Sequence, residues 1–250
     1  MRGRSSAFLC TFATRPEARA APKAGLPRLP PLVGYAQTNL DTDYGAVMTS
    51  AQFADVAATD GSIALSAITP VADEEIDAAY GVEIQILDNA GRTTNADYMW
   101  NGSAWEDANT GSALDAVSIP AGQGLWVASY VGEAVGLQTS GKVSTSDLSV
   151  ALDTDYGAVA VGNSFPTPVG LSEIMPVASE EVDMAYSVEI QILDNAGRTT
   201  DADFMWNGSA WEDANTGTVV DEVSIPAGQG LWVANYTGEA VSLYIPAPEL

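Results

Sequence analysis

Short runs of alternating apolar and polar residues predict β-strands throughout the chain. In residues 82–87 the apolar side chains of Val82, Ile84 and Ile86 fall on one face, as in a half-buried strand. The next four residues, 88–91, read Asp-Asn-Ala-Gly and predict a tight turn. The pattern therefore predicts two antiparallel strands joined by this turn.

The return strand ends at Trp100 and is followed by Asn101-Gly102, which predicts a two-residue hairpin turn. With that turn, Trp100 pairs with Ser103 and Tyr98 with Trp105. Tyr98, Trp100 and Trp105 then share one face of the hairpin.

Turn signals recur roughly every 8–12 residues, which is the spacing of a β-sandwich or a small barrel. Pro120 ends strand pairing, and Gly122 and Gly124 permit a sharp bend before the next strand. Helices are expected to be short, near Ser66 and Ser172 and in the segments 74–80 and 180–186, because the nearby prolines limit them.

One long stretch occurs twice. Residues 82–130 and 188–236 are identical at 42 of 49 positions with an offset of 106, and residues 40–47 return at 152–159 with an offset of 112. The first copy therefore holds a six-residue insertion. Units of this length indicate tandem domains rather than a short-repeat solenoid. We expect an all-β fold of two tandem antiparallel β-sandwich or small-barrel domains related by internal duplication, each with at most a short helix: repeat 1 (residues 34–139) and repeat 2 (residues 140–250).

Charge is distributed unevenly along the chain. Residues 1–33 are basic, rich in Ala and Pro and without periodicity, which predicts a disordered leader or a degenerate export signal. Residues 35–250 carry a net charge of -29, which repels phosphate backbones and anionic lipids. We therefore expect no nucleic-acid partner. No apolar run is long enough to predict a membrane span.

The repeats lack the residues of common catalytic sites. The chain has no histidine, and its only cysteine, Cys10, lies outside the repeats, so no Cys/His metal site, disulfide or thiolate nucleophile is expected in them. Adjacent acids such as Glu106 and Asp107 point to opposite faces of a strand and do not form a glycosidase pair. We expect no catalytic residues, no enzyme activity and no cofactor other than Ca²⁺.

All six tryptophans lie in the repeats, where they either fill a core or form an aromatic platform for sugars. We expect Trp126 to be a core residue, and Trp105 and Trp211, each followed by Glu-Asp, to be more exposed. The candidate carbohydrate-binding residues are the repeated aromatic face: Tyr98, Trp100, Trp105, Phe204, Trp206 and Trp211.

Closely spaced acids recur at equivalent places in the two repeats. Ca²⁺ prefers several oxygen ligands close together, so Asp41 and Asp43, with their copies Asp153 and Asp155, are candidate metal ligands. None of them fits the calcium-loop pattern of an EF-hand. The alternative is that they form turns or are simply solvated.

A series of segments in repeat 2 resembles a known pattern. The segments are Gly162-Asn-Ser-Phe-Pro166, Trp206-Asn-Gly-Ser-Ala-Trp211 and Ile225-Pro-Ala-Gly-Gln-Gly-Leu-Trp-Val233. In this order they resemble a tandem β-repeat of largely uncharacterised exported bacterial proteins. The resemblance implies export and a non-catalytic role, and it implies no functional residues. Repeat 1 departs from the pattern, since Met48-Thr-Ser-Ala-Gln-Phe53 stands in place of the first segment.

The sequence thus predicts a non-catalytic protein that is secreted or displayed on the cell surface, with a structural or adhesive role. The alternative function is a carbohydrate-binding module. Polysaccharides and other surface proteins are the partners considered, and self-association through exposed strand edges is a further prediction.

Overall fold

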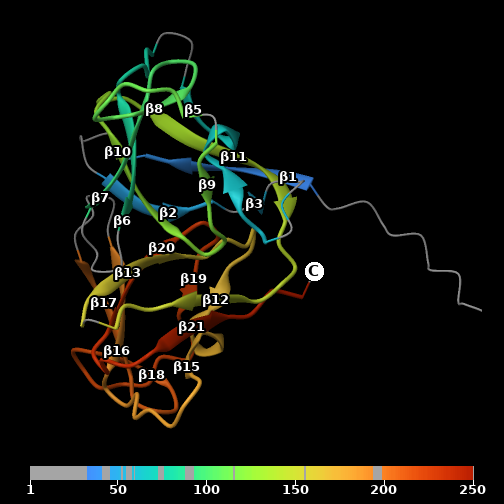
Figure 1. Ribbon diagram of the computed structural model, residues 1–250. Helices are drawn as coiled ribbons and strands as arrows, with labels where there is room; N and C mark the ends of the chain where they lie inside the picture. Colours follow the sequence, from blue (N-terminus) through green and yellow to red (C-terminus); the bar gives the residue numbers. More distant parts are fainter. Residues whose placement is uncertain are drawn as a thin grey trace, which may run out of the picture. The chain divides into compact units, whose positions relative to one another are not determined.

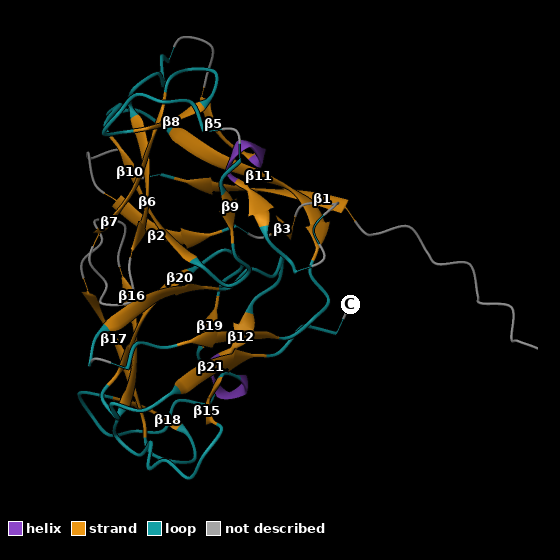
Figure 2. Cartoon of the chain, in the orientation of Figure 1, coloured by secondary structure: helices purple, strands orange, loops and turns teal. Residues whose placement is uncertain are grey.

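The alternating runs form strands, and every strand pair in the described part of the chain is antiparallel. Strands dominate the fold, and in the described part of the chain helix is confined to two short turns (Figure 2). The prediction of an all-β fold is confirmed. The computed structural model describes these residues: 33–40, 46–51, 53–54, 58, 60–72, 76–87, 93–114, 116–154, 156–193 and 199–249. The predicted leader lies outside them, except for Val33.

The first half of the chain, residues 33–143, contains three antiparallel sheets (Figure 1). One sheet has the order β2-β10-β6-β7-β8. A second has β11 between β1 and β3, with β5 also paired to β11, and the third is the pair β4-β9. The elements are β1 (Val33–Asn39), β2 (Ala46–Ser50), β3 (Phe53–Ala54), β4 (Ile63–Ala64), η1 (Leu65–Ala67), β5 (Ile68–Ala72), β6 (Val82–Leu87), β7 (Thr93–Trp100), β8 (Trp105–Asp107), β9 (Ser118–Ile119), β10 (Gly124–Ser129) and β11 (Val135–Val143).

The second half, residues 148–249, repeats this plan with the sheets β13-β20-β16-β17-β18, β12-β21-β15 and β14-β19. Its elements are β12 (Leu148–Ala151), β13 (Ala158–Gly162), β14 (Val169–Gly170), η2 (Leu171–Glu173), β15 (Met175–Ala178), β16 (Val188–Leu193), β17 (Thr199–Trp206), β18 (Trp211–Asp213), β19 (Ser224–Ile225), β20 (Gly230–Asn235) and β21 (Val241–Ile245).

Strand β6 confirms the first prediction of the sequence. Val82 and Ile84 are fully buried, and Ile86 is partly buried against the same core. The register between β6 and β7 shifts between Gln85 and Leu87. The predicted turn at 88–91 lies outside the described residues.

The predicted two-residue hairpin turn at Asn101-Gly102 is wrong. Trp100 pairs directly with Trp105, and Tyr98 pairs with Asp107, so the loop contains four residues. The Asn101 carboxamide oxygen accepts hydrogen bonds from the backbone N–H groups of residues 103 and 104, at 2.9 and 2.8 Å. This side chain stabilises the longer loop, and cross-strand pairing still places Tyr98, Trp100 and Trp105 on one face.

The buried apolar side chains gather in two large clusters, one in each half. The first contains Ile84, Trp105 and Leu125, and the second contains the equivalent Ile190, Trp211 and Leu231. A small third cluster joins the halves. Residues 31–250 form one compact unit, so the division into two domains remains a prediction. Its boundary at 139/140 falls inside β11, and the connector between the halves is 144–147.

The helical predictions are confirmed only as single 3₁₀ turns. Ser66 lies in η1 and Ser172 lies in η2. The segment 180–186 contains no helix and ends in a turn at Tyr186, whose φ is 56°. Residues 73–75 lie outside the described part of the chain, and the rest of the segment 74–80 is not helical.

Truncation of a buried indole tests this packing. Trp211 is 1% exposed, and its indole N–H donates to the Ile174 carbonyl oxygen at 2.8 Å. We expect Trp211→Ala to lower the free energy of unfolding by about 3–5 kcal/mol, measured by urea denaturation. Tyr35→Ala, at a side chain that is 73% exposed, should change it by less than about 0.5 kcal/mol. Equal effects of the two substitutions would contradict the packing described.

Candidate functional site

The predicted aromatic face is mostly buried. Tyr98 and Trp105 are 8% and 2% exposed, while Trp100 is partly exposed. In the second half all three equivalent side chains are buried: Phe204, Trp206 and Trp211. The expectation that Trp105 and Trp211 are exposed is therefore wrong. The reason is that the cross-strand pairing turns these side chains toward the space between the sheets.

The ring geometry also differs from a sugar platform. Trp100 and Trp105 meet edge to face, with centroids 5.4 Å apart and planes inclined by 65°. Trp206 and Trp211 repeat this geometry at 5.3 Å and 66°. An edge-to-face pair is a favourable packing arrangement, but a pyranose stacks on an open ring face. In this fold five of the six candidate residues belong to a core, and Trp100 packs against it, rather than forming an open, coplanar surface.

The indole N–H groups tie the five-stranded sheet of each half to the segment that follows its 3₁₀ turn. Trp105 Nε1 donates to the Ile68 carbonyl oxygen at 2.7 Å, just after η1. The equivalent bond joins Trp211 to Ile174. A buried indole N–H without a partner is costly, so these bonds fix the position of η1 and η2 over the core.

Trp126 is not the core residue that the sequence predicts. It lies on the outer face of β10, partly exposed, and packs against Met48 and Ala160 together with its copy Trp232. These four side chains belong to a contact between the halves, which we call the inter-repeat joint. It is formed by residues 48–50, 120–124, 160–164 and 226–230 together with Trp126 and Trp232.

Of the four candidate calcium ligands, the structure describes Asp153. Asp41, Asp43 and Asp155 lie outside the described residues. Asp153 is 8% exposed, and its carbonyl oxygen accepts a hydrogen bond from the Asn235 side chain at 2.9 Å. Within the described part of the chain, no group of three or more carboxylate or thiol side chains could hold a metal ion. The calcium site stays a prediction.

Two equivalent tyrosine–carboxylate pairs lie on the five-stranded sheets. The Tyr130 hydroxyl donates to Glu83 at 2.5 Å, and the Tyr236 hydroxyl donates to Glu189 at 2.6 Å. Partial burial, and then the glutamate partner, raises the pKa of each tyrosine to about 12. Asp97 lies opposite Gln85 on the same sheet, and burial raises its pKa, with further contributions from the charges of Glu83 and Asp107.

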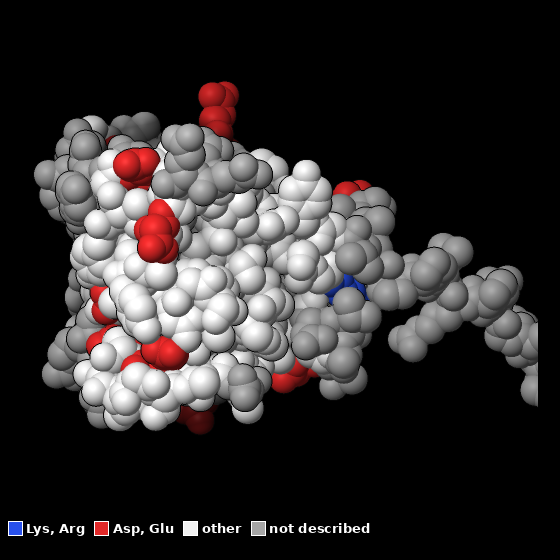
Figure 3. Space-filling view, turned by 90° about the horizontal axis from the view of Figure 1, so that it is seen from above, with Lys and Arg blue, Asp and Glu red and all other residues white. Residues whose placement is uncertain are grey.

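The acidic groups are dispersed over the surface that can be seen. Figure 3 shows Asp and Glu as separate small groups on one face. Among the described residues Lys142 is the one basic side chain. This pattern agrees with a solvated acidic surface. In the described part of the chain, no helix is long and apolar enough to cross a membrane.

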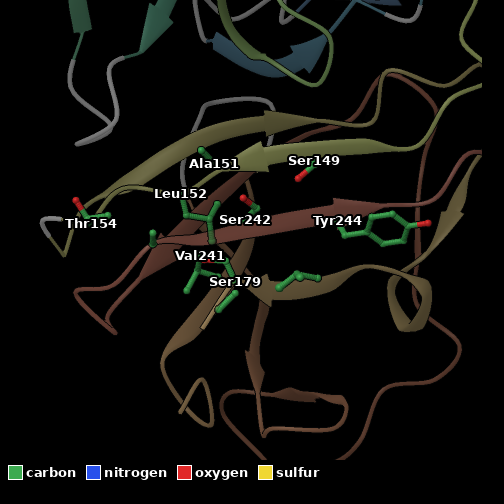
Figure 4. Close-up of a pocket in the computed structure, with 11 residues that line it drawn as sticks. Ser149, Ala151, Leu152, Thr154, Ser179, Val241, Ser242 and Tyr244 are labelled. Atoms are coloured by element: carbon green, nitrogen blue, oxygen red, sulfur yellow. The ribbon is translucent and has the colours of Figure 1, made fainter. Parts of the chain in front are cut away.

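A groove of about 430 Å³ lies over the outer face of β12, β21 and β15 (Figure 4). Ser149, Ser242 and Tyr244 bring hydroxyl groups to it, and Val177, 47% exposed, adds apolar surface. The Tyr244 hydroxyl donates to Asp147 at 2.7 Å, which fixes the ring. The described lining carries no charged side chain, so the groove offers contacts for binding and no acid–base pair.

The equivalent surface of the first half carries different side chains. The register places Gln37 and Gln138 where the second half has Ser149 and Tyr244. No local sequence pattern predicts the groove, because it depends on which face of three separate strands is left uncovered. The inter-repeat joint was not predicted either. The sequence feature that could have indicated it is the difference between repeat 1 and repeat 2 at residues 48–53.

One family model matches part of the chain. The bacterial Ig-like domain matches residues 98–208, a stretch about one repeat long. It begins within β7 of the first half and ends just after β17 of the second, so it is shifted relative to the two halves. No curated protein and no solved structure matches the chain. Bacterial Ig-like domains are typically non-enzymatic and are often exposed on the cell surface.

The tyrosine–glutamate pairs predict a loss of stability at high pH. A phenol whose folded-state pKa exceeds 10.0 stabilises the fold fully below pH 10 and loses this effect as the pH rises to about 12. We expect tyrosinate absorbance to show a phase near pH 12 and urea unfolding to become easier from pH 10 upward.

The double variant Tyr130→Phe/Tyr236→Phe should lose the phase near pH 12. Tyr35→Phe, which removes an exposed hydroxyl, should retain it. If all tyrosines ionised together near pH 10, the pairing with Glu83 and Glu189 would have no effect on the hydroxyl protons.

Proposed function

We propose that the chain is a non-catalytic structural or adhesive repeat protein that acts outside the cell, either secreted or held at the surface. The observation that carries this proposal is the match of residues 98–208 to the bacterial Ig-like domain. Domains of this kind are surface or structural modules. The resemblance of repeat 2 to the repeats of exported bacterial proteins supports the same location.

The side chains of the two cores support a scaffold role. The largest fully buried side chains, Trp105 and Trp211, stabilise the fold and are not available for ligands. The acidic surface keeps such a protein soluble at high local concentration through like-charge repulsion. On this proposal the partners are other surface proteins or polysaccharides, which meet the outer surface of the sheets.

Cell fractionation tests the proposed location. The chain, carrying a C-terminal epitope tag, should be found in the medium or be degraded when intact cells of the source organism are treated with protease. A cytoplasmic protein serves as the control and should survive until lysis. Protection of the tagged chain in intact cells, with none in the medium, would show that the protein is not displayed outside.

The role outside the cell is tested separately. Deletion of the gene should reduce attachment of cells to a surface if the role is adhesive, or increase sensitivity of the envelope to detergent if it is structural. Complementation by the full chain should restore the lost property. No change in either property would contradict both roles.

A further inference from the structure

The backbone contacts of the inter-repeat joint are reciprocal: each contact that the first half makes to the second is matched by an equivalent contact from the second half to the first. The Ser50 N–H donates to the Gly228 carbonyl oxygen at 3.0 Å, and the equivalent Gly162 N–H donates to the Gly122 carbonyl oxygen at 2.8 Å. Each of these bonds joins an edge strand of one half, β2 or β13, to a loop of the other half. The two halves therefore meet like the subunits of a twofold dimer.

Two further contacts are also reciprocal. Thr49 forms a bridge with Gln229, and the equivalent Val161 forms a bridge with Gln123. The carboxamides of these glutamines donate to carbonyl oxygens of the opposite half: Gln123 to Ala160 at 3.2 Å, and Gln229 to Met48 at 3.4 Å. The other half thus supplies partners for the N–H groups of Ser50 and Gly162 and for the carbonyl oxygens of Met48 and Ala160, all on the outer edges of β2 and β13.

The close approach of the two backbones depends on three glycines. Their backbone conformation is one that any residue can adopt, so conformation does not explain why they are glycine. Gly124, Gly162 and Gly230 all lie outside the left-handed region of φ. A Cβ at Gly124 would lie 2.8 Å from the Ala160 carbonyl carbon, and one at Gly230 would lie 2.7 Å from the carbonyl carbon of Met48. Both contacts are too short for real side chains, so the opposite half accounts for these glycines.

Two equivalent positions, one in each half, face each other across the joint and hold different residues. Ser50 and Gly162 are equivalent in the repeats, and a Cβ at Gly162 would fall on the Ser50 side chain, 2.6 Å from its hydroxyl oxygen. Ser50 is 3% exposed, and its hydroxyl has no hydrogen-bond partner among the described residues. The serine therefore contributes volume at this point. There is room for one such side chain and not for two.

We propose that the Ser50–Gly162 pair determines which surface each half can bind. The joint surface of the first half fits a repeat with glycine at the facing position, and it excludes a second copy of itself, because two serines would occupy the same space. A pair of second halves would avoid the clash but would lose Met48, which is 3% exposed and packs with Trp126 and Trp232. A first half paired with a second half avoids the clash between serines and also keeps the Met48 side chain in the joint.

The test uses four variants of the full chain and measures hydrogen exchange at the joint amides of residues 50 and 162. Gly162→Ser places serine against serine, and we expect exchange there to become roughly 10- to 100-fold faster because overpacking opens the joint. Ser50→Gly should keep slow exchange. The double variant Ser50→Gly/Gly162→Ser places serine against glycine again, in the reverse order, and should recover most of the protection.

Gly170→Ser is the matched control in the second half. A Cβ there would meet the flexible Glu173 carboxylate at 3.0 Å, away from the joint residues. Exchange at residues 50 and 162 should remain slow in this variant. Two results would overturn the proposal. One is slow exchange in Gly162→Ser alone. The other is equally fast exchange in the single and double variants, which would place the damage within the second half.

Discussion

The structure depends on how the edges of its five-stranded sheets are covered. An edge strand presents unpaired N–H and C=O groups. These groups lower the stability of the fold if they are buried without partners, and they promote aggregation if they are exposed. Here the outer edges of β2 and β13 are each met by the Pro-Ala-Gly-Gln-Gly loop of the opposite half. The loop can approach only because Gly124 and Gly230 carry no side chain. In the duplicated chain each half therefore covers the edge strand of the other, whereas in a single copy this edge would stay uncovered.

The aromatic side chains are best understood as the interior of each half. The indole N–H groups of Trp105 and Trp211 donate to carbonyl oxygens just after the 3₁₀ turns and tie these segments to the five-stranded sheets. The rings pack edge to face, which excludes water but leaves no flat face for a sugar. The tryptophans at the joint, Trp126 and Trp232, have a different role, because they lie on the outer faces of the sheets and pack against the Met48–Ala160 cluster that joins the halves. Binding surface is therefore to be sought on outer faces such as the groove over β12, β21 and β15.

A closed joint also limits how copies can associate. Contacts that are reciprocal about a twofold axis bury both copies of the contact surface against each other. No copy is left to bind a further chain, so these contacts do not propagate into a fibre. Edge pairing between chains through β2 or β13 would have to displace the loop of the opposite half. An acidic surface adds repulsion between copies. Together these features favour a discrete module over a self-assembling strand array at these edges.

The sequence by itself determined the secondary structure class, the duplication and the alternation of β6, because these depend on local periodicity and on comparison of the chain with itself. It did not determine the loop of four residues after Trp100, since Asn-Gly signals a tight turn and the stabilising contact of Asn101 is made only in the folded loop. Tertiary structure alone decided that Trp105 is buried and that Trp126 lies at the joint. Burial depends on which face of a strand another sheet covers, and no local pattern contains that information. The same reason applies to Ser50 and Gly162, which are 112 positions apart in the sequence and face each other only after both halves have folded.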